Sequence, residues 1–370
     1  KKITMGNKTK EIEKYFKNNV VKTDSLMVNS GSSANLLIFQ CLINPLVKKL
    51  KVGDEVLIPA ICWSTSLWPI IQSGLKVKFV DIDINSLNID LKDLEKKITK
   101  KTKALMLVHA LGNCTEMDKL IRICKKNKLI LVEDTCEALG SRFKNKQLGT
   151  FGEFSSFSFY YSHHITSGEG GMVCVKNKKY LDVIKSLRSH GWSRDLSNNR
   201  FISKKYKNID KNWIFINSGF NLRPTDINAA IGIQQLKRLK KILKIRKYNF
   251  LKIKKELINN KNYNKQFSIL SDQKYSNIAW FGIPFMLNSK NKTYKHKVMN
   301  KLNQKGVMTR PIISGNFANQ PSIQLYKIKS NTKLPNADLV DKKAFFLGLH
   351  NIKITDNKLK LLVDHIYASL

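Results

Sequence analysis

The sequence predicts an α/β fold in which a mostly parallel sheet is covered by helices on both faces. Short apolar runs alternate with amphipathic stretches through the first two-thirds of the 370 residues. Neither an internal repeat nor a low-complexity linker interrupts this alternation. About 42% of the residues are hydrophobic, and a chain of this length can bury a large core. These three observations favour an α/β protein of two packed units.

The expected strands of the first unit are short and largely apolar, as strands buried on both faces are. They cover residues 25–28, 55–59, 77–82, 104–111, 129–133, 154–159 and 172–175. Between them, apolar residues recur at the spacing of one helix face. The expected helices cover residues 8–18, 33–43, 91–98, 116–127 and 179–189.

The last third of the chain has a different pattern. A long helix is expected from about residue 224 to 258, with Pro224 at its start. Two strands, near 278–286 and 307–313, and two helices, near 336–345 and 356–368, should follow it. We therefore expect a large α/β domain over residues 1–235. Residues 236–370 should hold the connecting helix and a small C-terminal α+β domain.

Composition narrows the functional classes. The formal net charge is +39, but the basic residues are scattered and carry no nucleic-acid-binding motif, so no nucleic-acid partner is expected. No apolar run is long enough for a membrane span, and no signal-peptide pattern is present. The six cysteines lie singly in apolar segments, so we expect reduced thiols, no metal site and a cytoplasmic location.

Residues 29–34, Asn-Ser-Gly-Ser-Ser-Ala, join an expected strand to an expected helix. Gly31 would permit a tight turn between them. Ser32 and Ser33 would cap the helix and offer hydroxyl and backbone N–H groups to an anion. The motif predicts a phosphate site, and an ordinary helix cap is the alternative.

Two further residues follow expected strands, where ligands bind in open α/β sheets. Asp134 ends the run Leu-Ile-Leu-Val-Glu-Asp, so its carboxylate would point into the crevice at the sheet edge. Trp63 follows the strand at 55–59 and could stack on a flat ring. The alternatives are a solvated loop carboxylate and a core tryptophan.

These motifs occur in a fixed order, before a His-His pair, a Gly-Glu-Gly-Gly run and the turn Asn-Leu-Arg-Pro. The chain resembles the DegT/DnrJ/EryC/StrS group of sugar aminotransferases and dehydratases. Further segments that carry this resemblance are SGSSANLL, PAICWSTS, VKFVDIDINSLNID, SHGWSRDL, AAIGIQQLKRL and RPIISGNF. The resemblance runs from about Thr4 to the C-terminus, and the family's first helix is expected to be missing. It implies the fold of fold-type I pyridoxal-phosphate enzymes.

The resemblance also implies roles for the motif residues. Ser32, Ser158 and the backbone at Gly31 would bind the phosphate of the cofactor. Trp63 would stack on its ring. Asp134 would pair with the pyridine nitrogen and make the ring an electron sink, and Glu137 would lie near the ring hydroxyl.

Three residues further along would complete the site. His190 and Arg194 would line the substrate pocket, where Arg194 could hold a glutamate carboxylate or a sugar-nucleotide phosphate. Asn221 would reach the cofactor phosphate of a neighbouring subunit, which implies a homodimer with shared sites.

His163 decides the implied chemistry. It stands six residues before Glu169, where sugar aminotransferases of the family carry the lysine that binds the cofactor as a Schiff base. An imidazole forms no stable imine, so pyridoxal phosphate or pyridoxamine phosphate would be held non-covalently and His163 would act as an acid and base. This implies loss of the C3 hydroxyl from a nucleotide-linked 4-keto-6-deoxyhexose, with glutamate restoring the amine form. His164 is the second candidate for the base.

Alternatives stay open. GDP-4-keto-6-deoxy-D-mannose is the expected substrate, with CDP- and dTDP-linked ketosugars as alternatives. The rival functions are an ordinary aminotransferase and a cofactor-binding regulator without catalysis. A related CDP-hexose dehydrase also has a histidine here but uses an iron–sulfur cluster; Cys174 is the only cysteine after His163, so no cluster is expected.

Overall fold

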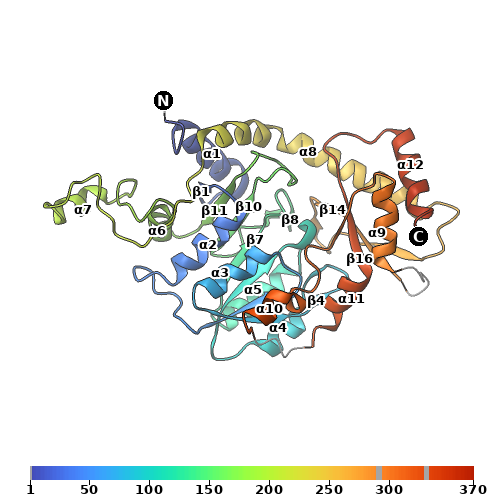
Figure 1. The fold of residues 1–370 in the computed structure, drawn as a ribbon, viewed down its shortest axis with the longest axis horizontal. Helices are drawn as coiled ribbons and strands as arrows, with labels where there is room; N and C mark the ends of the chain where they lie inside the picture. Colours follow the sequence, from blue (N-terminus) through green and yellow to red (C-terminus); the bar gives the residue numbers. More distant parts are fainter. Residues whose placement is uncertain (1, 289–293, 329–332) are drawn as a thin grey trace.

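The computed structural model describes residues 2–288, 294–328 and 333–370. Its centre is a seven-stranded sheet in the order β1-β11-β10-β7-β6-β2-β3 (Figure 1). The strands are β1 (Asp24–Val28), β2 (Glu55–Pro59), β3 (Lys76–Val80), β6 (Thr102–Val108), β7 (Ile130–Asp134), β10 (Phe154–Ser158) and β11 (Gly171–Val175). Only β11 runs antiparallel to its neighbours in this sheet. The predicted mostly parallel α/β sheet is confirmed.

Helices bury the central sheet on both faces. They are α1 (Asn7–Phe16), α2 (Gly31–Leu42), α3 (Ser64–Gln72), α4 (Leu91–Lys97), α5 (Met117–Lys126) and α6 (Lys178–Arg188). Alternate residues of β10 belong to different apolar clusters: Phe154 lies in the main core, whereas Phe157 packs with Phe16 of α1 at a ring distance of 5.0 Å. Because successive strand residues point to opposite faces, both faces of β10 are buried.

The long helix α8 (Asp226–Ile258) leads from the central sheet towards the C-terminal unit (Figure 1). Thr225 caps it, so Pro224 precedes the helix and is not its first residue. The Asp226 carboxylate accepts hydrogen bonds from the N–H groups of Gly6, Lys8 and Thr9, which fixes α1 against α8. The boundary that we predicted after residue 235 lies inside this helix, and the division into two domains stays a prediction.

The C-terminal unit is built on an antiparallel sheet in the order β12-β14-β16-β15. Its strands are β12 (Phe267–Ile269), β14 (Gly282–Leu287), β15 (Thr309–Pro311) and β16 (Ala344–Gly348). Its helices are α9 (Lys295–Gln304), α10 (Pro321–Leu325), α11 (Pro335–Lys343) and α12 (Asp356–Tyr367). Short strand pairs complete the fold: β4 (Ile82–Asp83) with β5 (Asn88–Ile89), and β8 (Arg142–Phe143) with β9 (Lys146–Gln147) and β13 (Ser276–Asn277).

The predicted helices and strands of this unit are present, but two of their boundaries were wrong and several elements were missed. The expected helix at 336–345 ends at Lys343, because residues 344–348 pair with β14 and β15 instead. The expected strand at 278–286 starts only at Gly282. β12, β16 and α9 were not expected, and in the first unit α3 was missed as well.

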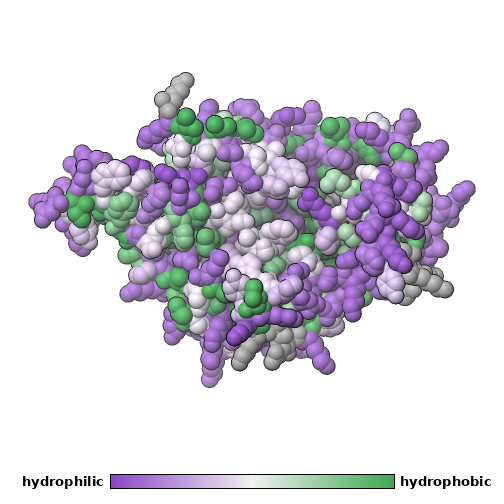
Figure 2. All heavy atoms as spheres, in the orientation of Figure 1, coloured by the Kyte–Doolittle hydropathy of each residue, from purple (hydrophilic) through white to green (hydrophobic). Residues whose placement is uncertain are grey.

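An arm containing α7 (Asn199–Lys205) projects from the body of the molecule (Figure 1). It has its own small apolar cluster of Leu196, Ile202 and Ile214. Apolar side chains also lie on its outer surface (Figure 2). In the described parts of the chain, no helix is both long and apolar enough to cross a membrane.

Candidate active site

The carboxyl ends of the central strands bring the predicted phosphate-binding residues together. Ser158 is the last residue of β10, and α2 begins at Gly31 directly beside it. A methyl group on Gly31 would lie 2.8 Å from Cβ of Ser158 and 3.0 Å from Sγ of Cys136. Gly31 does not have a positive φ. It therefore permits close packing of α2 on the strand ends, and our explanation by a tight turn was wrong.

The start of α2 also differs from the prediction in its cap. Ser30 is the N-cap, and its Oγ accepts the N–H of Ser33 at 3.0 Å. Ser32 Oγ instead forms a 2.8 Å hydrogen bond with Oγ1 of Thr65 in α3. The start of α2 and the hydroxyls of Ser32 and Ser158 lie at the same sheet edge, and the phosphate site there stays a prediction.

Asp134, the last residue of β7, is only 6% exposed. Its Oδ2 accepts hydrogen bonds from Nδ2 of Asn35 at 2.9 Å and Oγ of Ser66 at 2.7 Å. Its Oδ1 accepts the N–H of Cys136 at 3.1 Å. The alternative of a solvated loop carboxylate was wrong.

Trp63 lies at the start of α3, and Glu137 lies in the loop after β7. Trp63 is the N-cap of α3 and is 56% exposed, so the alternative of a core tryptophan was wrong. Glu137 Oε2 accepts the N–H of Leu111 at 2.8 Å. Burial raises the pKa of Glu137 to about 7; the Leu111 hydrogen bond opposes this shift and the charge of Asp134 adds to it.

The two adjacent histidines have different surroundings. His164 is fully buried, and its Nε2 lies 2.8 Å from the carbonyl oxygen of Ala279. Nδ1 of His163 has no hydrogen-bond partner among the described residues, and its ring lies 5.2 Å from that of Phe281. Burial lowers the pKa of His163 to about 4, against the opposing charge of Asp134. His163 is therefore a neutral imidazole at pH 7, able to accept a proton.

The structure adds Arg310, which we had not singled out from the sequence. It lies in β15, and its charge lowers the pKa of both Glu137 and His163. With Tyr161, Ser162 and residues of β14, β15, β16 and α12, it lines a cavity of about 660 Å³ beside the His163 loop. The only sequence signal was its place in the segment RPIISGNF, since the approach of Arg310 to Glu137 and His163 is a tertiary feature.

His190, Arg194 and Asn221 form a second group around Trp192. The guanidinium of Arg194 lies 4.2 Å from the Trp192 ring, and the His190 ring lies 4.9 Å from it. Asn221 is exposed, and its Oδ1 accepts a hydrogen bond from Nε of Arg223. No hydrogen bond or ion pair joins this group to His163 in the described part of the chain. Within one chain, the predicted site residues therefore form two separate groups, one near His163 and one around Trp192.

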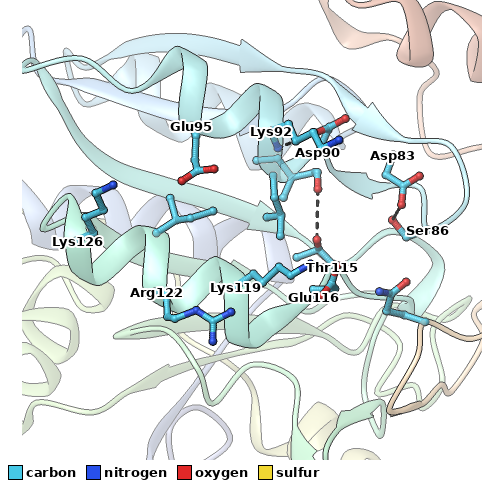
Figure 3. Close-up of a pocket in the computed structure, with 14 residues that line it drawn as sticks. Asp83, Ser86, Asp90, Lys92, Glu95, Thr115, Glu116, Lys119, Arg122 and Lys126 are labelled. Atoms are coloured by element: carbon cyan, nitrogen blue, oxygen red, sulfur yellow. Dashed lines mark hydrogen bonds and ion pairs between the residues drawn. The ribbon is translucent and has the colours of Figure 1, made fainter.

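A separate crevice of about 590 Å³ lies between α4 and α5 (Figure 3). It contains none of the predicted site residues, and four acidic and four basic side chains line it. The charges of this lining balance in number, so they do not by themselves indicate an anion or a cation as ligand. Among the described residues, no group of three His, Cys, Asp or Glu side chains is arranged to hold a metal ion.

Comparison with known proteins decides the family. The model of the DegT/DnrJ/EryC1/StrS aminotransferase family matches residues 1–366. This chain belongs to that family. Among its members, a GDP-4-keto-6-deoxy-D-mannose 3-dehydratase from Escherichia coli is 35% identical over 359 residues, covering 96% of this chain and 91% of the relative.

Two solved structures of proteins with this enzyme name are similar to this chain over nearly its whole length. A GDP-4-keto-6-deoxymannose-3-dehydratase variant with bound GDP-perosamine has a TM-score of 0.89 at 33% identity, covering 98% of this chain and 93% of that one. The same enzyme with a trapped PLP-glutamate geminal diamine has a TM-score of 0.88 at 33% identity, with 98% and 93% covered. The fold predicted for this chain, that of fold-type I pyridoxal-phosphate enzymes, is therefore confirmed.

Proposed function

We propose that this chain is a pyridoxamine-phosphate-dependent 3-dehydratase of GDP-4-keto-6-deoxy-D-mannose. The product would be a 4-keto-3,6-dideoxyhexose, and glutamate would restore the cofactor's amine form. The observation that carries this proposal is the neutral imidazole of His163 close to Asp134, in a loop from Tyr160 to Gly171 without any lysine. We infer that His163 replaces the lysine that forms the Schiff base in aminotransferases of the family.

The residues at the sheet edge fit a non-covalently held cofactor. The buried Asp134 carboxylate suits a protonated pyridine nitrogen, and the cradle formed by Gly31, Ser32 and Ser158 suits a phosphate. The exposed Trp63 ring offers a stacking surface, and Glu137 would lie near the ring hydroxyl. Nδ1 of His163, which lacks a partner, would face the reacting atoms.

The chain's own groups would carry the proton transfers. The bound cofactor supplies an amine that condenses with the C4 ketone and a ring that accepts electrons. Neutral His163 would remove a proton from the cofactor's C4′ carbon. The imidazolium would then donate this proton to the C3 hydroxyl oxygen, which leaves as water. One group serves both steps because both atoms would lie on the same face of the cofactor.

Two arginines, one of them on the same aromatic face as His190, support an anionic substrate and amino donor. His190 and Arg194 lie on the Trp192 face, and Arg310 lines the cavity beside the His163 loop. We propose that Arg194 binds a glutamate carboxylate or a sugar-nucleotide phosphate. The structures of related enzymes with bound GDP-perosamine and with a PLP-glutamate adduct favour GDP as the nucleotide of the substrate and glutamate as the amino donor.

We also propose that the working unit is a homodimer and that Asn221 completes the partner's phosphate site. Exposed apolar side chains that a second copy could cover are Phe201, Trp213 and Phe215 on the arm, and Ile227 and Ile231 on α8. Such an exposed area is typical of an interface. Analytical ultracentrifugation should give about twice the chain mass of 42.5 kDa. A monomer with full turnover would refute shared sites.

The six unpaired cysteines, five of them buried, are consistent with a reducing compartment. We therefore propose a cytoplasmic location.

The function is tested by incubation of the protein with pyridoxal phosphate, glutamate and GDP-4-keto-6-deoxymannose, followed by mass spectrometry of the nucleotide sugar. We expect a product that lacks one oxygen, together with released ammonia. An amino sugar would instead establish the rival aminotransferase. If only the CDP- or dTDP-linked ketosugar were dehydrated, the proposed reaction would stand and the proposed nucleotide would be wrong. If none of these ketosugars were converted, the non-catalytic regulator would be favoured.

A further inference from the structure

Arg246 lies in the middle of α8 and is only 4% exposed. One of its guanidinium nitrogens donates hydrogen bonds to the carbonyls of Trp280 at 3.0 Å and Phe281 at 2.7 Å. The other donates to the carbonyl of Leu349 at 2.6 Å and to Oδ1 of Asn351 at 3.2 Å. No carboxylate in the described part of the chain forms an ion pair with it. A buried cation of this kind is stable only while these acceptors stay in place.

The segment held by Arg246 contacts the catalytic loop directly. The carbonyl of Ala279 lies 2.8 Å from Nε2 of His164, and the Phe281 ring lies 5.2 Å from the ring of His163. The N–H of Phe281 donates to the carbonyl of Leu111, whose own N–H binds Glu137. The short segment from Ala279 to Phe281 therefore lies between α8, the histidine loop and the loop that holds Glu137.

We propose that Arg246 is a positioning residue for His163: its guanidinium fixes the Trp280–Phe281 backbone, and the Phe281 ring then holds the imidazole in place. The inference rests on the proposed catalytic role of His163. It assigns a function to the extended stretch before β14, where the main chain binds Arg246. Arg246 itself touches no reacting atom.

The charge of Arg246 acts on the same imidazole. Four charged or titratable groups act on His163: Asp134 from β7, Arg310 from β15, Arg246 from α8 and the adjacent His164. Asp134 raises the pKa of His163, whereas Arg246 and Arg310 lower it. Loss of Arg246 would leave Asp134 less opposed and would admit water around a looser Phe281 ring. Both changes raise the pKa of His163 towards its ordinary value.

Asn249 provides a matched control on the same helix. It is also buried, and it binds the same C-terminal loop through the carbonyls of His350 at 3.1 Å and Ile352 at 2.8 Å. It forms no hydrogen bond with Trp280 or Phe281. Asn249→Ala therefore loosens the contact of α8 with this loop while leaving the segment beside His163 in place.

The first readout is the pKa of the His163 imidazole, measured by NMR in histidine-labelled, cofactor-free protein and assigned with His163→Asn. We expect Arg246→Gln to raise this pKa by about one unit and Asn249→Ala to leave it unchanged. Arg246→Lys keeps a cation but loses the planar fork, so its shift should be smaller. Equal pKa values in wild type, Arg246→Gln and Arg246→Lys would overturn the proposal.

The second readout is dehydration by the holoenzyme. Arg246→Lys and Phe281→Leu should each lower kcat about tenfold or more with little change in KM, because a displaced base slows chemistry and not binding. Neither change should slow a His163→Asn enzyme further; an additive loss there would show a merely structural role. If Arg246→Gln does not fold, Arg246→Lys and Phe281→Leu carry the test. Absence of turnover in wild type would contradict the proposed function and leave the NMR result standing.

Discussion

Replacement of His163 by lysine is expected to abolish dehydration, with a loss of about a hundredfold or more. A lysine at this position would bond covalently to the cofactor and would be protonated when free at neutral pH, whereas the neutral imidazole can accept a proton. Borohydride reduction should then fix the cofactor to the variant, detected as a mass increase of the protein. Wild type should show no such increase. Full dehydratase activity in His163→Lys would refute the proposed base.

The control for this experiment is the neighbouring histidine. His164 is fully buried against the carbonyl of Ala279. His164→Gln keeps a hydrogen-bond donor towards that carbonyl, so we expect most of the turnover to remain and some thermal stability to be lost. If His164→Gln abolished turnover and His163→Asn did not, the base would have to be reassigned to His164.

Asp134→Asn is expected to have the second-largest effect, a loss of turnover of about a hundredfold together with weaker cofactor binding. A neutral amide cannot stabilise a protonated pyridine nitrogen. Its NH₂ group would also face the donors of Asn35 and Ser66, which now bind Oδ2. Cofactor affinity and turnover are measured separately, by fluorescence titration and by product formation. Unchanged values of both would refute the role of Asp134.

Glu137→Gln is the matched carboxylate-to-amide control. Because the pKa of Glu137 is about 7, the wild-type group is largely protonated below that pH and an amide resembles it. We therefore expect a small loss at pH 6 that grows as the pH rises above 7. Asp134→Asn should be impaired across the whole range. Similar pH profiles of the two variants would contradict the distinction between the two carboxyl groups.

The residues around Asp134 show which features of the site could be predicted from sequence patterns. The apolar run that ends in Asp134 predicted both a buried strand and the position of its carboxylate, because carboxyl ends of parallel strands meet at one edge. The family resemblance, and not this rule, brought Ser158 and Gly31 together, and the tight turn expected at Gly31 was the wrong cause for its glycine. The need for glycine comes from Ser158 and Cys136, which are far away along the chain.

The C-terminal unit was predicted less well. Residues 344–348 form β16 because β14 and β15 lie on both sides of them, whereas we had expected the preceding helix to continue to residue 345 and no strand to follow it. Arg310 and Arg246 lay in segments that looked unremarkable for catalysis. Their relation to His163 depends on how β15 and α8 pack, which no local spacing encodes.

The sequence by itself determined the fold class, the family, and the identity and order of Asp134, Ser158 and His163. These depend on periodicity and on motifs that are local in the chain. Only the tertiary structure shows how the surroundings of the two adjacent histidines differ. Nδ1 lacks a hydrogen-bond partner among the described residues in both histidines, but Nε2 of His164 lies against the carbonyl of Ala279, and the charges of Asp134, Arg246 and Arg310 act on His163. Desolvation and charge act through space, so contacts distant in sequence decide the chemistry of two adjacent and chemically identical side chains.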